Sequence, residues 1–319
     1  MGDTATNNAN SVVRGCICAI IGAVCWGFSA TCASYLMHTF GMSVTWLVSM
    51  RLIITGTMFL IFSLITARDK VLLLVRDRRL LVNTIVFAIF GMMCIQVSYM
   101  QAVKYAGAGV ALLLQETGVV MVMLYTCVMQ RRLPYRSEVA AIVLAMAGVF
   151  CIATQGNLSS LGIPFLGLTW GLISGVCIAA YNIIPVKVLD KCGSLPLNGI
   201  GMPIAAVLFL PIGQPWNVPS MPWQGWAGLA AVCIIGTFIA YLAYLQGVKD
   251  AGPVKAGLVG MLEPVSGMAF SFIWLHEAIT LYDAIGCVLI FGMLALVSKP
   301  TGDEGEAAEQ ETDEVVQKG

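Results

Sequence analysis

The sequence predicts an all-helical membrane protein in which ten transmembrane helices form two inverted five-helix repeats around a central cavity. Three observations predict it: an apolar composition, an uneven distribution of basic residues and an internal repeat. Of the 319 residues, 59% are apolar and 11% are charged, and the mean hydropathy is +0.87. A soluble domain is about half apolar and a quarter charged. The composition therefore excludes a soluble enzyme, a nucleic-acid-binding protein and a disordered chain.

Apolar runs long enough to cross a bilayer as helices occur ten times along the chain. We place them at 14–36, 44–66, 80–102, 108–129, 137–154, 163–186, 196–213, 225–247, 254–275 and 281–298. Long unbroken runs indicate helices, because backbone in lipid must satisfy its own hydrogen bonds and a β-barrel would show short alternating strands. We expect residues 1–13 and the acidic tail at 300–319 to be disordered.

The basic residues follow the alternation of the loops. With ten spans, one side of the membrane receives fifteen Lys and Arg residues, the other side receives only Lys104, and Arg51 lies within a span. Basic residues accumulate in cytoplasmic loops. We therefore expect a multi-pass protein of the inner (plasma) membrane with both termini in the cytoplasm.

The chain also matches itself. Residues 91–107 align with residues 236–252 at an offset of 145, with seven identities that include Tyr99/Tyr244 and Gly107/Gly252. A second match, at an offset of 152, joins two stripes of small residues four apart: Gly15, Ala19, Ala23 and Gly27, and Gly167, Gly171, Gly175 and Ala179. The repeat units, 14–154 and 163–298, hold five spans each. An odd number inverts the second copy, as in many secondary transporters.

Three short motifs carry a family resemblance: Trp26-Gly27 in the first span, Glu263-Pro264 in the ninth, and the run His276-Glu277-Ala278-Ile279-Thr280 before the tenth. With the five-helix repeat, the chain resembles the EamA branch of the drug/metabolite transporter superfamily over roughly residues 14–298. Within that branch it looks most like the YddG-type amino-acid exporters. The resemblance implies a basket of ten helices around a cavity lined chiefly by helices 1, 3, 4, 6, 8 and 9. It also implies export of amino acids or related metabolites through the inner membrane.

Ionisable residues within spans are the first candidates for function, since each costs about 2.5–3.5 kcal/mol on insertion scales. Glu116 and Glu263 enter the fourth and ninth spans from opposite sides, which places both carboxyls near mid-membrane. Either could bind a substrate amine or carry a proton, and either could be structural. Glu263, in particular, could bond backbone groups freed beside Pro264, which has no N–H to donate.

Arg51, near the start of the second span, is a possible charge partner. It could bind a substrate carboxylate, pair structurally with another residue, or extend its long stem to the outer headgroups. Its repeat counterpart is Pro203, so the symmetry of the repeat does not require the charge.

Aromatic and amide side chains complete the predicted pathway. Tyr99 and Tyr244 would be gating residues or interfacial anchors, whereas Gln96 and Tyr241 lie one turn deeper. The full set that we expect to line the substrate pathway is Trp26, Gln96, Tyr99, Glu116, Tyr181, Tyr241, Tyr244 and Glu263.

A secondary transporter that works by alternating access fits these observations best. The sequence carries no Walker A pattern, so ATP would not drive it directly. A membrane-embedded transferase-type enzyme would need a catalytic cluster such as HExxH, which the sequence lacks, and a sensor or scaffold would need a signalling domain. We expect no cofactor, no metal and no nucleic-acid partner. The expected partners are the lipid bilayer and a small-molecule substrate, with the monomer sufficient for function and proton coupling left open.

Overall fold

The computed structural model describes residues 2–157, 162–260 and 262–297, and within these ranges every regular element is a helix. The elements that run across the molecule are α1 (Gly2–Thr39), α2 (Val44–Thr66), α4 (Arg78–Val86) with η1 (Phe87–Met93) and α5 (Cys94–Ala106), α6 (Ala108–Gln115) with α7 (Gly118–Met129), α8 (Arg136–Thr154), α9 (Phe165–Ile183), α11 (Ser194–Gly213), α12 (Trp223–Ala230) with η2 (Ala231–Ile239) and α13 (Ala240–Ala251), α14 (Pro253–Gly260), α15 (Leu262–Leu275) and α16 (Leu281–Val297).

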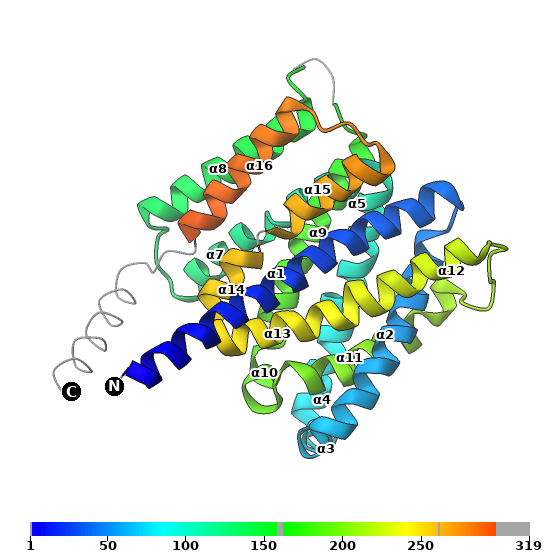
Figure 1. Ribbon diagram of the computed structural model, residues 1–319, viewed down its shortest axis with the longest axis vertical. Helices are drawn as coiled ribbons and strands as arrows, with labels where there is room; N and C mark the ends of the chain where they lie inside the picture. Colours follow the sequence, from blue (N-terminus) through cyan, green and yellow to red (C-terminus); the bar gives the residue numbers. More distant parts are fainter. Residues whose placement is uncertain (1, 158–161, 261, 298–319) are drawn as a thin grey trace.

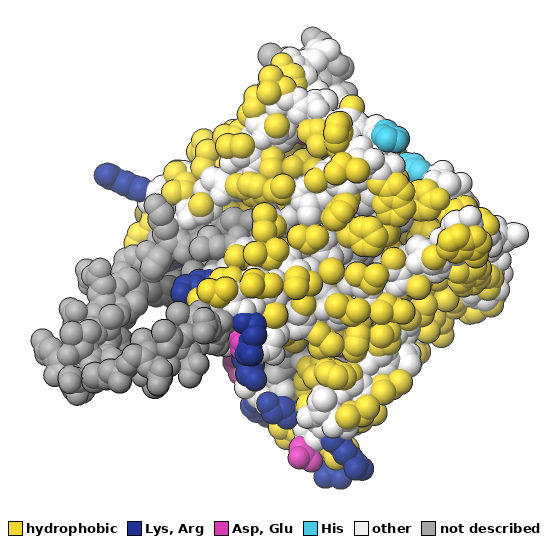
Figure 2. All heavy atoms as spheres, in the orientation of Figure 1, with side chains coloured by type: hydrophobic (Ala, Val, Ile, Leu, Met, Phe, Trp, Pro, Cys, Tyr) yellow, Lys and Arg dark blue, Asp and Glu magenta, His cyan; other side chains and the backbone are white. Residues whose placement is uncertain are grey.

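Eight helical stretches of the described chain are long and apolar enough to span a membrane, and Leu262–Leu275 and Leu281–Leu296 are shorter apolar helices. Large apolar side chains cover the visible face of the molecule, while Lys and Arg side chains gather toward one edge (Figure 2). Such an apolar exterior is suited to lipid, and the chain is a multi-pass membrane protein. Each expected span overlaps one of these stretches, and ten crossings remain a prediction.

The main helix contacts join residues 2–154 to residues 165–297. In Figure 1, α8 lies beside α16 on one side of the molecule and α2 beside α11 on the other, with α1, α5, α9, α13 and α15 between them. In this central group, α1 packs against α13 and α15, and α9 packs against α5, α6 and α7. The centre is therefore built from helices of both parts of the chain.

The stripes of small residues allow these central helices to approach closely. A Cβ on Gly15 would lie 2.5 Å from the backbone nitrogen of Ala251, and a Cβ on Gly167 would lie 2.9 Å from the Cβ of Ala106. Ala106 and Ala251 are themselves 145 residues apart. The stripes thus make equivalent contacts, and close packing through small residues is typical of membrane helices.

Unusual backbone conformations also recur at the repeat offsets. The π-helical segments η1 and η2 occupy aligned positions. The pairs with positive φ are Gly41 and Gly193 (62° and 81°), Gly107 and Gly252 (82° and 85°), and Arg131 and His276 (52° and 55°). A positive φ is uncommon for residues other than glycine, so its recurrence at Arg131 and His276 is the most unusual of the three.

Three local features differ from expectation. The basic connection after α2 contains a helix, α3 (Arg68–Arg76), whose Val71 and Leu74 are buried three residues apart. The sixth span is shorter than 163–186, because α9 ends at Ile183 and a separate short helix, α10 (Val186–Cys192), follows Pro185. The structure also continues α1 back to Gly2 where we expected disorder. Disorder of residues 1–13 stays a prediction. The acidic tail lies outside the described residues.

Candidate functional site

A cavity of about 500 Å³ lies between the central helices. It extends from Trp26 in α1 and Glu263 at the start of α15 to the end of the molecule at which α10 packs against α3 and α4. Its walls consist of Trp26, Arg51, Phe59, Phe87, Met92, Ile95, Gln96, Tyr99, Gln115, Ile178, Tyr181, Asn182, Pro185, Leu189, Ser194, Leu197, Asn198, Met202, Thr237, Tyr241, Tyr244, Leu245 and Glu263.

The structure brings most of the candidate residues to this cavity. The lining includes Trp26, Arg51, Gln96, Tyr99, Tyr181, Tyr241, Tyr244 and Glu263. Glu116 is not part of the lining, although its neighbour Gln115 is. Glu116 lies where the chain turns between α6 and α7. The sequence predicted one continuous helix here, and a continuous helix does not give the direction of this side chain. That these residues form a substrate pathway stays a prediction.

Arg51 is held inside the protein rather than at its surface. Arg51 is 9% exposed, and its Nε donates a hydrogen bond to Oγ1 of Thr237 at 2.9 Å. The Thr237 hydroxyl in turn donates to the carbonyl of Val232, five residues earlier in η2, at 2.8 Å. The π-helical segment therefore orients the oxygen that accepts from Arg51. This burial does not fit extension of the side chain to outer headgroups.

Glu263 provides the opposite charge. Among the described residues, its carboxylate makes no hydrogen bond or salt bridge, although it interacts electrostatically with Arg51 and Glu116. Ser266 Oγ donates to the main-chain carbonyl of Glu263 at 2.8 Å. The carboxylate itself thus bonds none of the described backbone groups beside Pro264, and both its functional and its structural roles stay predictions.

Aromatic rings form part of the wall. The ring centroids of Trp26 and Tyr244 are 5.0 Å apart, and so are those of Phe87 and Tyr181. Asn198 Nδ2 donates a hydrogen bond to the hydroxyl of Tyr241. The cavity therefore has polar groups set into a largely aromatic and apolar surface.

Several lining residues were missed from the sequence, and the repeat could have identified three of them. Four pairs of aligned residues line the cavity: Trp26/Ile178, Met92/Thr237, Gln96/Tyr241 and Tyr99/Tyr244. Applying the offsets to Trp26 identifies Ile178, and moving one turn from Gln96 and Tyr241 identifies Met92 and Thr237. No comparable pattern marks Asn182, Ser194 or Asn198.

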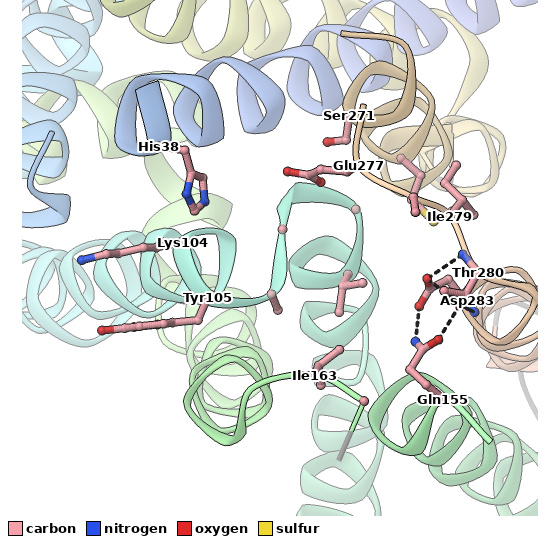
Figure 3. Close-up of a pocket in the computed structure, with 17 residues that line it drawn as sticks. His38, Lys104, Tyr105, Gln155, Ile163, Ser271, Glu277, Ile279, Thr280 and Asp283 are labelled. Atoms are coloured by element: carbon pink, nitrogen blue, oxygen red, sulfur yellow. Dashed lines mark hydrogen bonds between the residues drawn. The ribbon is translucent and has the colours of Figure 1, made fainter. Parts of the chain in front are cut away.

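A second cavity of about 580 Å³ lies at the opposite ends of the helices. Figure 3 shows Lys104 and Tyr105 on one wall, with Thr280, Asp283 and Gln155 on another. Gln155 Nε2 donates to Oδ1 of Asp283 at 2.6 Å, and the hydroxyl of Thr280 donates to Oδ2 of Asp283 at 2.8 Å. The bond of Gln155 joins the end of α8 to the start of α16.

Tightly packed backbone separates the two cavities. A Cβ on Gly27 of α1 would lie 2.6 Å from the nitrogen of Gly267 in α15, and a Cβ on Gly109 of α6 would lie 3.0 Å from the Cα of Met268. Gly109 and Met268 line the second cavity, whereas Glu263, one turn earlier on α15, lines the first. The two spaces thus approach each other from opposite ends without joining.

No group of three or more His, Cys, Asp or Glu side chains in the described chain is arranged to hold a metal ion. All eleven cysteines are free, and most lie within helices, where they act as small packing residues.

Comparisons with known proteins agree with the helical architecture. The model of the EamA-like transporter family matches residues 13–154 and 165–299. The chain is 28% identical over 302 residues to the uncharacterized inner membrane transporter YicL of Salmonella typhimurium, covering 93% of this chain and 99% of the relative. It is 23% identical over 174 residues to the uncharacterized transporter YcbK of Bacillus subtilis, covering 52% and 56%. A solved structure described only as a crystal structure of a protein shares the fold, with a TM-score of 0.58, 17% identity and coverage of 90% and 97%.

Proposed function

The chain belongs to the EamA-like transporter family, and we propose that it is a secondary transporter that exports amino acids or related small metabolites across the inner membrane by alternating access. The observation that carries this proposal is the cavity of about 500 Å³, whose wall is built from aligned residues of both halves. Secondary transporters place their substrate site at such an interface between repeats.

Two inverted repeats of five transmembrane helices form the proposed architecture. The recurrence of positive φ angles, the aligned π-helical segments and the equivalent contacts of the small stripes support it. The family model also matches the chain in two stretches that correspond to the proposed halves. In this arrangement, exchanging the conformations of the halves closes the first cavity and opens a path from the substrate site to the opposite side.

The proposed orientation places the first cavity on the cytoplasmic side. That cavity reaches the end of the molecule near α3 and α10, which carry Arg68, Lys70, Arg76, Lys187 and Lys191. Positive charge favours the cytoplasmic side, so both termini would be cytoplasmic and the second cavity would face outward. The described conformation would then be inward-facing, ready to load a solute for export.

An enzyme or a sensor receives less support. The relatives are named as transporters. A single chain contains both halves of the pathway, so we propose that the monomer transports.

Efflux from proteoliposomes tests the proposal. Purified protein is reconstituted into liposomes preloaded with individual labelled amino acids, and release is measured against protein-free liposomes, with and without a pH gradient. We expect saturable, protein-dependent release of a subset of amino acids. A panel of amino acids and related metabolites that all leave at the rate of empty liposomes would contradict the transporter function.

A further inference from the structure

We propose that Arg51 and Glu263 bind the two charges of one zwitterionic substrate, the carboxylate on Arg51 and the ammonium on Glu263, and that transport selects amino acids with uncharged side chains. This inference rests on the proposed function, because it assigns the substrate class of the same cavity. It goes further by naming the two contacts and the solutes that they exclude.

The first support is the charge of the cavity wall. Glu116 interacts electrostatically with Glu263 but lies outside the lining. Of the described residues that line the cavity, Arg51 and Glu263 are the only Arg, Lys, Asp or Glu residues. They have opposite signs and come from opposite halves of the chain. A neutral zwitterion would keep the occupied cavity neutral, whereas glutamate or lysine would bring in a further charge without a partner. Burial of an unpaired charge is strongly unfavourable.

The second support is the unused bonding capacity of the two groups. The Nε of Arg51 is held by Thr237, and no bond of its two terminal nitrogens is found in the described chain. The carboxylate of Glu263 is likewise unbonded there, and the two groups form no salt bridge with each other despite their electrostatic interaction. Buried charges are normally paired. A ligand that carries both complementary charges would pair them together.

The third support is the chemistry of the two groups and of the remaining wall. A guanidinium fixed at Nε still presents parallel donors that match a carboxylate, and a carboxylate accepts readily from an ammonium. The rest of the wall is largely apolar and aromatic, and Phe59, Phe87 and Met202 are among its residues. Such a surface suits an uncharged side chain.

Binding of leucine and of two analogues tests the assignment on the full-length purified protein. The probe is labelled L-leucine, and the competitors are 4-methylpentanoate, which lacks the ammonium, and 3-methylbutylamine, which lacks the carboxylate. Because hydrogen bonds to charged groups are among the stronger ones, we expect each analogue to bind about tenfold or more weakly than leucine. Glutamate and lysine should compete at least as poorly.

Variants then assign each charge to its residue. In Arg51→Gln, leucine should lose its advantage over 3-methylbutylamine but keep its advantage over 4-methylpentanoate. In Glu263→Gln the reverse should hold. Arg136→Gln and Asp69→Asn remove the same charges outside both cavities, and they should leave the selectivity of the parent protein unchanged.

Several results would overturn the assignment. These are analogues that bind the parent protein as well as leucine does, variants that weaken all three ligands equally, and failure of leucine to bind at all. If a variant does not fold, the analogue series on the parent protein decides. Efflux measured alongside separates the two proposals. Flux of a solute that is not a zwitterion overturns this inference alone, whereas absence of flux for every solute contradicts the transporter function.

Discussion

Substitution of Gly27 by alanine should loosen the packed layer between the two cavities. An added Cβ would meet Ser266 Oγ, the nitrogen of Gly267 at 2.6 Å and the carbonyl oxygen of Glu263 at 2.7 Å. Ordinary contact begins near 3.4 Å. Two of these neighbours are backbone atoms, so α1 and α15 would have to separate by about 0.8 Å, the difference between the contact distance and 2.6 Å.

The expected magnitude follows from two opposing effects. Overpacking of a well-packed interior costs about 1–3 kcal/mol, and contact with backbone on two sides favours the upper value. Replacing glycine by alanine within a helix returns up to about 1 kcal/mol. The net loss of about 2 kcal/mol should lower the midpoint of thermal unfolding by about 4 °C, at roughly 2 °C per kcal/mol.

Thermal unfolding in detergent and leucine efflux provide the assay. Efflux should fall together with stability, because the displaced helix carries Glu263. Gly292→Ala in α16 is the matched control, since its Cβ would lie 3.4 Å from Leu144 Cδ1 in ordinary contact. Equal or higher unfolding midpoints for Gly27→Ala than for Gly292→Ala would refute the account of this helix contact.

Three further predictions concern topology, coupling and the second cavity. Cysteines introduced at positions 5 and 315 should react only with reagent on the cytoplasmic side, because the basic loops lie there; labelling of either from outside would contradict the inverted alignment. A pH gradient should not change the rate of export, because the outward gradient of the amino acid suffices to drive its export; a gradient effect that Glu116→Gln or Glu263→Gln abolishes would instead identify a proton carrier. Gln155→Ala should lower the free energy of unfolding by about 1–3 kcal/mol through loss of the bond to Asp283, measured against Gln130→Ala, and an unchanged midpoint would show that this bond does not stabilise the fold.

The repeat made much of the site predictable from sequence. An offset of 145 residues placed Tyr99 and Tyr244 in equivalent positions, and both line the cavity. The method worked because a helix presents every third or fourth residue on one face, so identities spaced by turns identify a shared surface. The helix α3 was not predicted, because charged residues lowered the hydropathy around its two buried apolar positions.

Other features depend on geometry that a sequence pattern does not contain. Glu116 was expected to line the cavity, but it lies at the turn that follows α6, and its neighbour Gln115, the last residue of α6, lines the wall. Thr237 accepts from Arg51 because a π-helical segment shifts the register of its helix by one residue per turn. Neither the turn nor the π-helix has a marked signal in composition.

The most direct test of alternating access compares Ser194 with its repeat counterpart Met42. Ser194 lines the first cavity, whereas Met42 is 2% exposed at the other end of the molecule. If the halves exchange conformations, Met42 must come to line the outward opening. In a variant whose eleven native cysteines are replaced, Ser194→Cys should react with an impermeant thiol reagent applied from the cytoplasmic side. Met42→Cys should react from the outside, and only during substrate turnover. A Met42→Cys protein that transports yet stays unlabelled from the outside would contradict alternating access through inverted repeats.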